Sequence, residues 1–402
     1  MALMPVADAI QRILAQGSTL PAEKVALADC HGRTLAADLT AQRTQPPDAM
    51  SAMDGYAARA ADVAKVPATL KVIGEVAAGH PIARELAPGE AARIFTGGVV
   101  PRGADTIVIQ ENTKRDGDSV TVTSSSPVGK HVRKQGIDFK AGDILLKKGR
   151  RLSDRDLMLA AGMNFPALPV FKLPKVAVLA TGDELVAPGS NPKPGEIIHS
   201  NGYALAALLR SEGAQVIDLG IAKDKMDDIR ACIRKARDAG ADILLTTGGA
   251  SVGDHDLVQQ ALKAEGLDLS FWKIAMRPGK PMMHGKLGAM HVVGVPGNPV
   301  SSYVCTLIFV LPLLRLMSGR SELLPKMIEA KLGRDMSEND ERAEYMRASL
   351  TQAPDGTLTA TPFPSQDSSL TSPLSKADCL LFRDIHAPAA KAGSRAVILK
   401  LG

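Results

Sequence analysis

Apolar positions follow three patterns in succession along the chain. Val6, Ile10, Ile13 and Leu14 are spaced as on one face of a helix. Residues 24–142 instead alternate short β-prone runs with Gly- and Pro-rich turns, which predicts a mainly β region. Its clearest runs are Thr69–Val76, Thr106–Ile109 and Ser119–Thr123. Asp154–Met163 is helical again, so we expect the residues after Gly142 to return and pack on the first helix.

The segment 172–319 alternates apolar strands with helical patterns. Strands are predicted at Val176–Leu179, Val216–Leu219, Ile243–Leu245 and Met290–Val295. Helices are predicted at Tyr203–Leu209, Met226–Ala236, Leu257–Leu262 and Val300–Leu316. Strands that are apolar on both faces and alternate with helices indicate a doubly wound, mostly parallel sheet. From Met327 onward the pattern is β-rich, with a hairpin signal at residues 354–356.

These patterns predict a multidomain α/β plus β protein. Residues 1–26 and 143–171 form a discontinuous N-terminal helical and linker domain, interrupted by a β-rich insertion domain over residues 27–142. Residues 172–319 form the α/β domain. Residues 320–402 form a C-terminal β-barrel-like domain.

Composition narrows the class of protein. The chain has 402 residues, 45% of them hydrophobic, and a net charge of +5 without a long basic run or interleaved aromatics, so neither membrane nor nucleic-acid binding is indicated. The four cysteines are far apart and form no C-x-x-C pair, which favours reduced thiols. No signal peptide is recognisable, and we expect a cytoplasmic protein.

Three glycine- or proline-containing loops follow predicted strands, at residues 180–184, 247–256 and 295–299. Ligands of open parallel sheets bind where loops leave the carboxyl ends of the strands, and helix N-termini attract anions. Glycine and proline in any one loop could simply make a tight turn. Three such loops on one sheet favour a phosphate site.

Acidic residues lie in or near these loops, namely Asp183, Glu184, Asp224, Asp254 and Asp256. An acid just before a helix, such as Asp254, is often only an N-cap. Several acids around a phosphate would repel it unless a divalent cation stood between them, which points to Mg²⁺.

Basic residues cluster around a Pro-Gly turn, where Lys273, Arg277 and Lys280 are predicted either to form ion pairs or to contact an oxyanion. Both interpretations of the basic cluster remain open.

The histidines His131, His199 and His255 share no metal-ligand spacing. The chain contains no Walker A loop. A metal-assisted phosphate or nucleotide-ester site on the α/β domain is therefore expected.

Six motifs in this order carry a family resemblance. They are residues 51–57 (SAMDGYA), 93–97 (RIFTG), 181–185 (TGDEL), 248–256 (GGASVGDHD), 278–281 (PGKP) and 296–301 (PGNPVS). Together they resemble the molybdopterin molybdenumtransferase (MoeA) family, which includes the C-terminal domain of gephyrin. The resemblance covers nearly the whole chain.

The resemblance implies an elongated homodimer whose active site lies between the α/β domain of one subunit and the β insertion of the other. It implies that adenylylated molybdopterin is bound, that molybdate is inserted at the dithiolene, and that the pterin–AMP phosphoanhydride is hydrolysed with Mg²⁺. The molybdopterin adenylyltransferase and molybdoenzymes are the implied protein partners.

The resemblance also implies roles for individual residues. Catalytic positions are Asp54, Thr96, Asp138, Glu184, Asp224 and Asp256, of which Glu184, Asp224 and Asp256 would hold the metal. The substrate-binding positions are Thr181, Gly182, Asp183, Gly248, Gly249, Ser251, Gly253, Lys273, Arg277, Lys280, Pro296, Gly297, Asn298 and Pro299. Residues 366–369 lack the family's usual glycines, which leaves the last domain's share of the site open.

Two alternative functions are compatible with the same α/β domain. One is a molybdopterin adenylyltransferase, although that enzyme needs only the α/β part. The other is a non-catalytic carrier or scaffold for molybdopterin, although the acids Asp54, Glu184, Asp224 and Asp256 favour retained chemistry.

Overall fold

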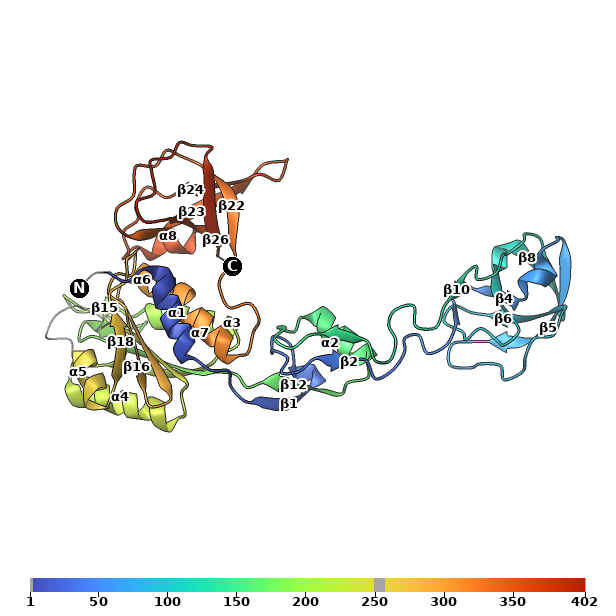
Figure 1. Ribbon diagram of the computed structural model, residues 1–402, viewed down its shortest axis with the longest axis horizontal. Helices are drawn as coiled ribbons and strands as arrows, with labels where there is room; N and C mark the ends of the chain where they lie inside the picture. The colour runs from blue at the N-terminus through green and yellow to red at the C-terminus, as the bar shows by residue number, and fades with distance from the viewer. Residues whose placement is uncertain (1–2, 249–256, 402) are drawn as a thin grey trace.

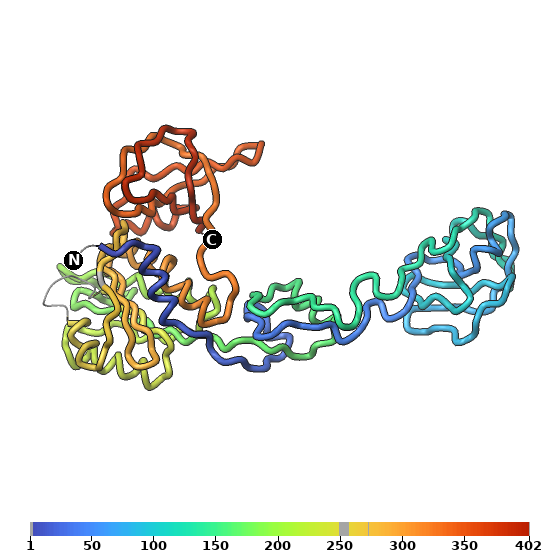
Figure 2. The backbone as a smooth tube through the Cα atoms, viewed as in Figure 1, coloured from blue at the N-terminus to red at the C-terminus, as the bar shows by residue number. Residues whose placement is uncertain are grey.

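The protein is elongated and consists of four compact bodies (Figures 1 and 2). The structure, a computed structural model, describes residues 3–248 and 257–401. An α/β body (residues 175–317) and a barrel body (residues 327–400) lie together at one end. A middle body (residues 22–40 and 144–171) follows, and a distal body (residues 50–133) lies at the far end. The chain crosses to the distal body and back, so the distal body is an insertion, as the sequence predicted.

The α/β body is built on a six-stranded sheet. The strand order is β16 (Gln215–Ala222), β13 (Lys175–Thr181), β17 (Ile243–Thr247), β21 (Met290–Val295), β20 (Met283–Leu287) and β18 (Asp268–Trp272). The first four strands are parallel, whereas β20 and β18 are antiparallel. The mostly parallel sheet predicted from the apolar runs is confirmed, with two antiparallel strands added at one edge. A short parallel pair, β14 (Leu185–Val186) and β15 (Ile197–Ile198), lies outside this sheet.

Both faces of this sheet are buried, because alternate side chains of each strand point to opposite faces. Helices α4 (Met226–Asp238) and α5 (Leu257–Ala264) share an apolar core with Ala177 and Leu179 of β13. The other face, which includes Val176 and Val178, packs with α3 (Asn201–Ser211) and the helical segment 299–317. The sheet is therefore doubly wound.

The segment 299–317 is one long helical element with a π-helical centre. It comprises α6 (Pro299–Cys305), η4 (Thr306–Val310) and α7 (Leu311–Met317). Pro312 lacks the N–H that would bond to the preceding turn, and such a missing bond is a common cause of helix irregularity. Pro299–Met317 is long and apolar enough to cross a membrane, but 83% of it is buried inside the structure, as in a core helix.

Helix α1 (Val6–Gln16) does not pack where the sequence predicted. Its buried residues Ala9 and Ile13 belong to the same core as Leu313 and Leu314 of α7. Helix α2 (Asp154–Gly162) contributes to a separate core in the middle body. The expected packing of α1 with the residues after Gly142 was wrong, because helical spacing reveals an apolar face but not the surface that this face covers. The other domain boundaries stay predictions.

The middle body is small. It contains the antiparallel pair β1 (Ala22–Ala26) and β12 (Ala167–Phe171), and a second pair, β2 (Leu39–Thr40) and β11 (Ile144–Leu146). The 3₁₀ turn η1 (Leu27–Asp29) packs near α2. Ser153 and Asp156 form a capping box that fixes the start of α2.

The distal body is a six-stranded sheet. Its order is β7 (Thr106–Ile109), β4 (Gly55–Ala58), β6 (Glu90–Ile94), β5 (Ala68–Val76), β9 (Ser119–Val122) and β8 (Thr113–Asp116). Two short 3₁₀ turns, η2 (Ala60–Val63) and η3 (Gln110–Asn112), connect its strands. The pair β3 (Met50–Ser51) and β10 (Val132–Arg133) lies where the chain enters and leaves this body.

The barrel body closes on itself, because β23 pairs with both β24 and β25. Its strands are β22 (Met327–Leu332), β23 (Ala343–Gln352), β24 (Leu358–Pro362), β25 (Cys379–Arg383) and β26 (Arg395–Lys400), with the short helix α8 (Thr371–Ser375). The strand β19 (Met276–Arg277) pairs with β23 and joins the barrel body to the α/β body. The predicted C-terminal β-barrel-like body is confirmed.

Candidate functional site

The three loops predicted to bind phosphate leave the same end of the sheet. Strands β13, β17 and β21 are parallel neighbours, with Ala180 beside Thr247 and Thr247 beside Val295. The carboxyl ends of these strands therefore lie together, and the residues that directly follow them, up to Gly248 in the case of β17, start from one edge of the sheet.

Two of these loops touch through glycine backbone. Gly248 has a φ of +91°, and a Cβ there would lie 2.7 Å from the carbonyl oxygen of Thr181. A Cβ on Gly297 would lie 3.7 Å from the Cα of Gly248, which is an ordinary contact. Only glycine meets both the conformational and the steric demand at position 248.

A cavity of about 420 Å³ opens at this end of the sheet. Six of the predicted site residues line it: Thr181, Glu184, Gly248, Gly297, Asn298 and Pro299. Sequence reasoning missed several further lining residues, among them His199, Ser200, Asn201, Ser369 and Thr371. The first three precede or begin α3, and the last two come from the barrel body.

Side-chain and backbone hydrogen bonds hold these segments around the cavity. The amide of Asn201 donates to the carbonyl oxygen of Gly297 at 2.6 Å. The amide of Asn298 donates to the hydroxyl of Ser368 at 2.9 Å, and the backbone N–H of Val300 donates to the Ser368 carbonyl oxygen at 3.0 Å. The barrel body thus contributes to the site even though its loop lacks the family's usual glycines.

The imidazole of His199 is half-buried at the same cavity. Burial lowers its pKa, an effect that the charge of Asp218 opposes, so the ring favours its neutral form. The only sequence signal for its position was its place just before a predicted helix.

The acids Asp183 and Asp224 tie two loops together. The backbone N–H of Asp183 donates to the carboxylate of Asp224 at 3.3 Å, and that of Asp224 donates to the carboxylate of Asp183 at 3.2 Å. Glu184 is exposed and its carboxylate lies against Gly182, where a Cβ would meet it at 2.5 Å. Within residues 3–248 and 257–401, no group of three or more His, Cys, Asp or Glu side chains is arranged to hold a metal ion. Four predicted residues, Gly249, Ser251, Gly253 and Asp256, lie outside the described residues.

The predicted basic residues do not line the cavity. Arg277 is ion-paired with Asp340 and with Glu344 of the barrel body, each at 3.2 Å. For Arg277 the ion-pair alternative is therefore the one observed. Lys273 has a φ of +74°, and Lys280 is exposed.

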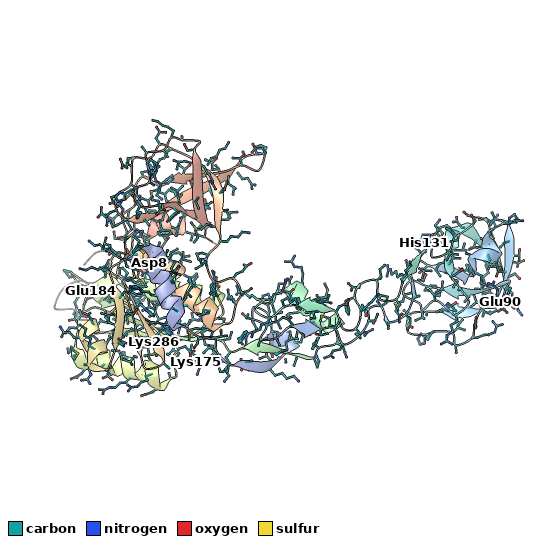
Figure 3. All side chains as sticks on the ribbon, viewed as in Figure 1. Asp8, Glu90, His131, Lys175, Glu184 and Lys286 are labelled. Carbon is teal, nitrogen blue, oxygen red and sulfur yellow. The ribbon has the colours of Figure 1, made fainter. Side chains whose placement is uncertain are left out.

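The remaining predicted residues lie far from the cavity. Asp54 and Thr96 are in contact at the surface of the distal body, and Asp138 is exposed on the return connection. Figure 3 places Glu184 at one end of the molecule and His131, near the Asp54 loop, at the other. One copy of the chain does not bring the two sets of residues together.

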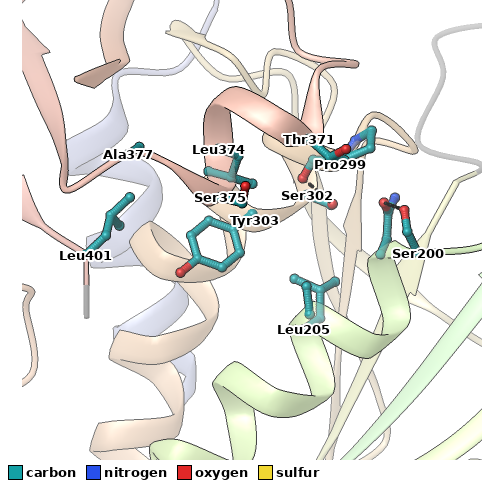
Figure 4. A pocket seen from close by; sticks show the side chains of 12 residues that line it. Ser200, Leu205, Pro299, Ser302, Tyr303, Thr371, Leu374, Ser375, Ala377 and Leu401 are labelled. Carbon is teal, nitrogen blue, oxygen red and sulfur yellow. Dashed lines mark hydrogen bonds between the residues drawn. The ribbon is translucent and has the colours of Figure 1, made fainter. Parts of the chain in front are cut away.

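A more apolar pocket of about 490 Å³ adjoins the site cavity (Figure 4). It shares Ser200, Asn201, Pro299 and Thr371 with that cavity. Tyr303, Leu205, Leu374 and Leu401 supply its apolar walls from α6, α3, α8 and the C-terminal segment.

Comparison with known proteins gives matches along the chain. Residues 4–163 match the MoeA N-terminal region (domain I and II), residues 177–316 a probable molybdopterin binding domain, and residues 329–401 the MoeA C-terminal region (domain IV). A molybdopterin molybdenumtransferase from Nostoc sp. is 37% identical over 82% of this chain and 77% of its own length. The chain belongs to the MoeA family.

Other members of the MoeA family match this chain over a larger share of its length. A molybdopterin molybdenumtransferase from Staphylococcus aureus (strain COL) is 33% identical over 94% of this chain and 91% of its own. The crystal structure of a molybdopterin biosynthesis MoeA protein from Pyrococcus horikoshii OT3 superimposes with a TM-score of 0.86, at 28% identity and over 100% of both chains. The four-body architecture is thus that of the family.

Proposed function

We propose that this protein is a molybdopterin molybdenumtransferase, which inserts molybdate into adenylylated molybdopterin and releases AMP. The observation that carries the proposal is the cavity at the carboxyl ends of β13, β17 and β21, lined by Thr181, Glu184, Gly248 and residues 297–299. The names of the relatives from Nostoc and Staphylococcus support it.

The cavity suits a phosphoanhydride. Glycine at positions 248 and 297 lets a ligand approach the backbone closely. The helical segment Pro299–Met317 begins at the cavity, and the positive end of a helix dipole favours negative charge. The apolar pocket beside the cavity offers a binding surface for a flat, aromatic part of the substrate.

The residues present are compatible with Mg²⁺. Protein-bound Mg²⁺ typically takes one or two carboxylates together with substrate phosphates and water, so a complete protein cage is not required. Glu184 lines the cavity, and Asp224 is held beside the same loop through Asp183. These two acids would hold the ion, which would offset the negative charge on the phosphate oxygens.

The active form is proposed to be a homodimer in the cytoplasm. Asp54 and Thr96 of the distal body and Glu184 of the α/β body belong to one predicted site, yet they lie at opposite ends of one chain (Figures 1 and 3). A second copy that brings its distal body to the cavity satisfies both placements.

One assay tests the proposal. Purified protein receives adenylylated molybdopterin, Mg²⁺ and molybdate, and both AMP release and reconstitution of a molybdoenzyme are followed. We expect both to depend on molybdate. AMP incorporation from ATP would instead indicate an adenylyltransferase, and binding without turnover would indicate a carrier.

A further inference from the structure

A second cavity, of about 580 Å³, lies where the middle body meets the α/β body. It shares no lining residue with the cavity at the strand ends. Seven basic side chains line it but only two acidic ones, Glu212 and Glu322. The basic residues are Lys147, Lys148, Arg150, Arg151, Arg315, Arg320 and Lys326.

The charge of Glu212 is already matched twice. Its carboxylate pairs with Arg315 at 2.8 Å and with Arg320 at 2.6 Å. The side chain of Arg320 is only 9% exposed, and its Nε has no hydrogen-bond partner within the described part of the chain. One carboxylate therefore serves two guanidinium groups, one of them nearly buried.

Three other bases at the cavity lack a compensating acid. Arg151 donates to the main-chain carbonyl oxygens of Ser211 at 2.6 Å and Gly32 at 3.3 Å, which do not neutralise its charge. Among the residues that the structure describes, no carboxylate pairs with Lys148, Arg151 or Lys326. Lys147 and Arg150 pair outside the cavity lining, with Asp38 and Asp156.

The excess positive charge acts on the buried arginine. Burial lowers the pKa of Arg320, Glu212 opposes that shift, and the neighbouring Arg151 and Arg315 lower the pKa further. Like charges held close together at a partly desolvated site are unfavourable, and an anion placed between them relieves the repulsion.

We propose that this junction cavity binds a small polyvalent oxyanion of the phosphate class, such as pyrophosphate or the phosphate chain of a nucleotide. Its volume suits a small molecule, and its fork-shaped arginines suit phosphate oxygens. The proposal goes beyond the transferase reaction, because none of the predicted site residues lines this cavity.

The ligand would also connect two bodies. Lys148 and Arg151 belong to the middle body, whereas Arg320 and Lys326 follow α7. A backbone hydrogen bond already joins the two sides of this junction: the N–H of Ser321 donates to the carbonyl oxygen of Gly149 at 3.1 Å. A bound anion would add ionic contacts from both sides and so stabilise one arrangement of the two bodies.

The test is calorimetric titration of the full-length protein with inorganic pyrophosphate at low ionic strength. We expect saturable binding, and binding about tenfold weaker in Lys148→Gln/Lys326→Gln, because two positive charges are removed from the cavity lining. Both lysines are exposed, so this variant should fold normally. Lys148→Arg/Lys326→Arg should restore binding.

The matched control is Lys65→Gln/Lys114→Gln, which removes two exposed lysines of the distal body. It should bind as the unaltered protein does. Equal affinity in all variants would place the anion elsewhere and overturn the proposal, as would binding of an oligonucleotide but not of pyrophosphate. Neither result bears on AMP release, so the proposed transferase activity stands or falls separately.

Discussion

Asp54 accepts two hydrogen bonds from Thr96 on the same carboxylate oxygen. The backbone N–H of Thr96 lies 2.7 Å from Asp54 Oδ1, and its hydroxyl oxygen lies 2.8 Å away. Both bonds favour the charged form and therefore lower the pKa of Asp54, and the backbone bond has the larger effect. An exposed carboxylate is thus held ionised in a fixed direction, as a group that contacts a ligand would be.

Replacing this carboxylate should strongly reduce activity without unfolding the protein. For Asp54→Ala we expect AMP release to fall roughly a hundredfold, the scale of a lost catalytic contact. The midpoint of thermal unfolding should hardly change, because Asp54 is exposed. Asp116→Ala, at another exposed acid of the distal body, is the control and should keep full activity. A large drop in the melting temperature of the Asp54 variant would show that its role is structural.

Two inactive variants should complement each other if the site is shared between subunits. Asp54→Ala removes a group of the distal body, and Glu184→Ala removes one at the opposite end of the folded molecule. When the two proteins are unfolded and refolded together, half of the dimers should be mixed, and each mixed dimer regains one intact site. We expect about a quarter of the unaltered turnover to return. No recovery in a refolded mixture shown to contain mixed dimers would mean that each subunit works alone.

Local sequence patterns predicted the elements that are locally determined. Continuous apolar runs such as Ile243–Leu245 correctly marked the parallel strands, and the glycine loops after them correctly marked one edge of the sheet. Strand β20 was missed because His284 and Lys286 interrupt its apolar pattern. That strand is fixed by its neighbours rather than by its own sequence.

Long-range contacts account for the part of the site that was missed. Asn201 and Thr371 join the cavity only because α3 and the barrel body fold against it. The choice between an ion pair and a free cation at Arg277 depended on Asp340 and Glu344, more than sixty positions away. No local pattern contains that information.

Substitutions at the two neighbouring glycines of the cavity, Gly248 and Gly297, should have different effects on stability. Gly248→Ala combines a positive φ with a Cβ placed 2.7 Å from the carbonyl oxygen of Thr181. We expect a loss of about 1–3 kcal/mol in the free energy of unfolding and a strong loss of substrate binding. Gly297→Ala meets its nearest atom at 3.7 Å and should change stability by less than about 0.5 kcal/mol. Equal stabilities for the two variants, measured by denaturant unfolding, would contradict the close approach.

A buried histidine pair should make the α/β body sensitive to acid. His284 Nε2 lies 3.1 Å from His291 Nδ1, and the two residues are 0% and 2% exposed. Burial lowers the pKa of His284 to about 3 and that of His291 to about 4, and the charge of Lys286 adds to both shifts. Both rings are therefore neutral in the folded protein at neutral pH.

The sign of the pH effect follows from these shifts. Between pH 6.5, where an unfolded histidine titrates, and pH 4, the unfolded chain binds more protons than the folded one, so stability is lost as the pH falls. The loss should be about 3 kcal/mol for each of the two rings. Denaturant unfolding followed by far-UV circular dichroism measures the stability at each pH. In His284→Leu/His291→Leu the loss should be much smaller, whereas His80→Gln, at an exposed histidine, should behave as the unaltered protein. An unchanged acid dependence in the double variant would assign the effect to other groups.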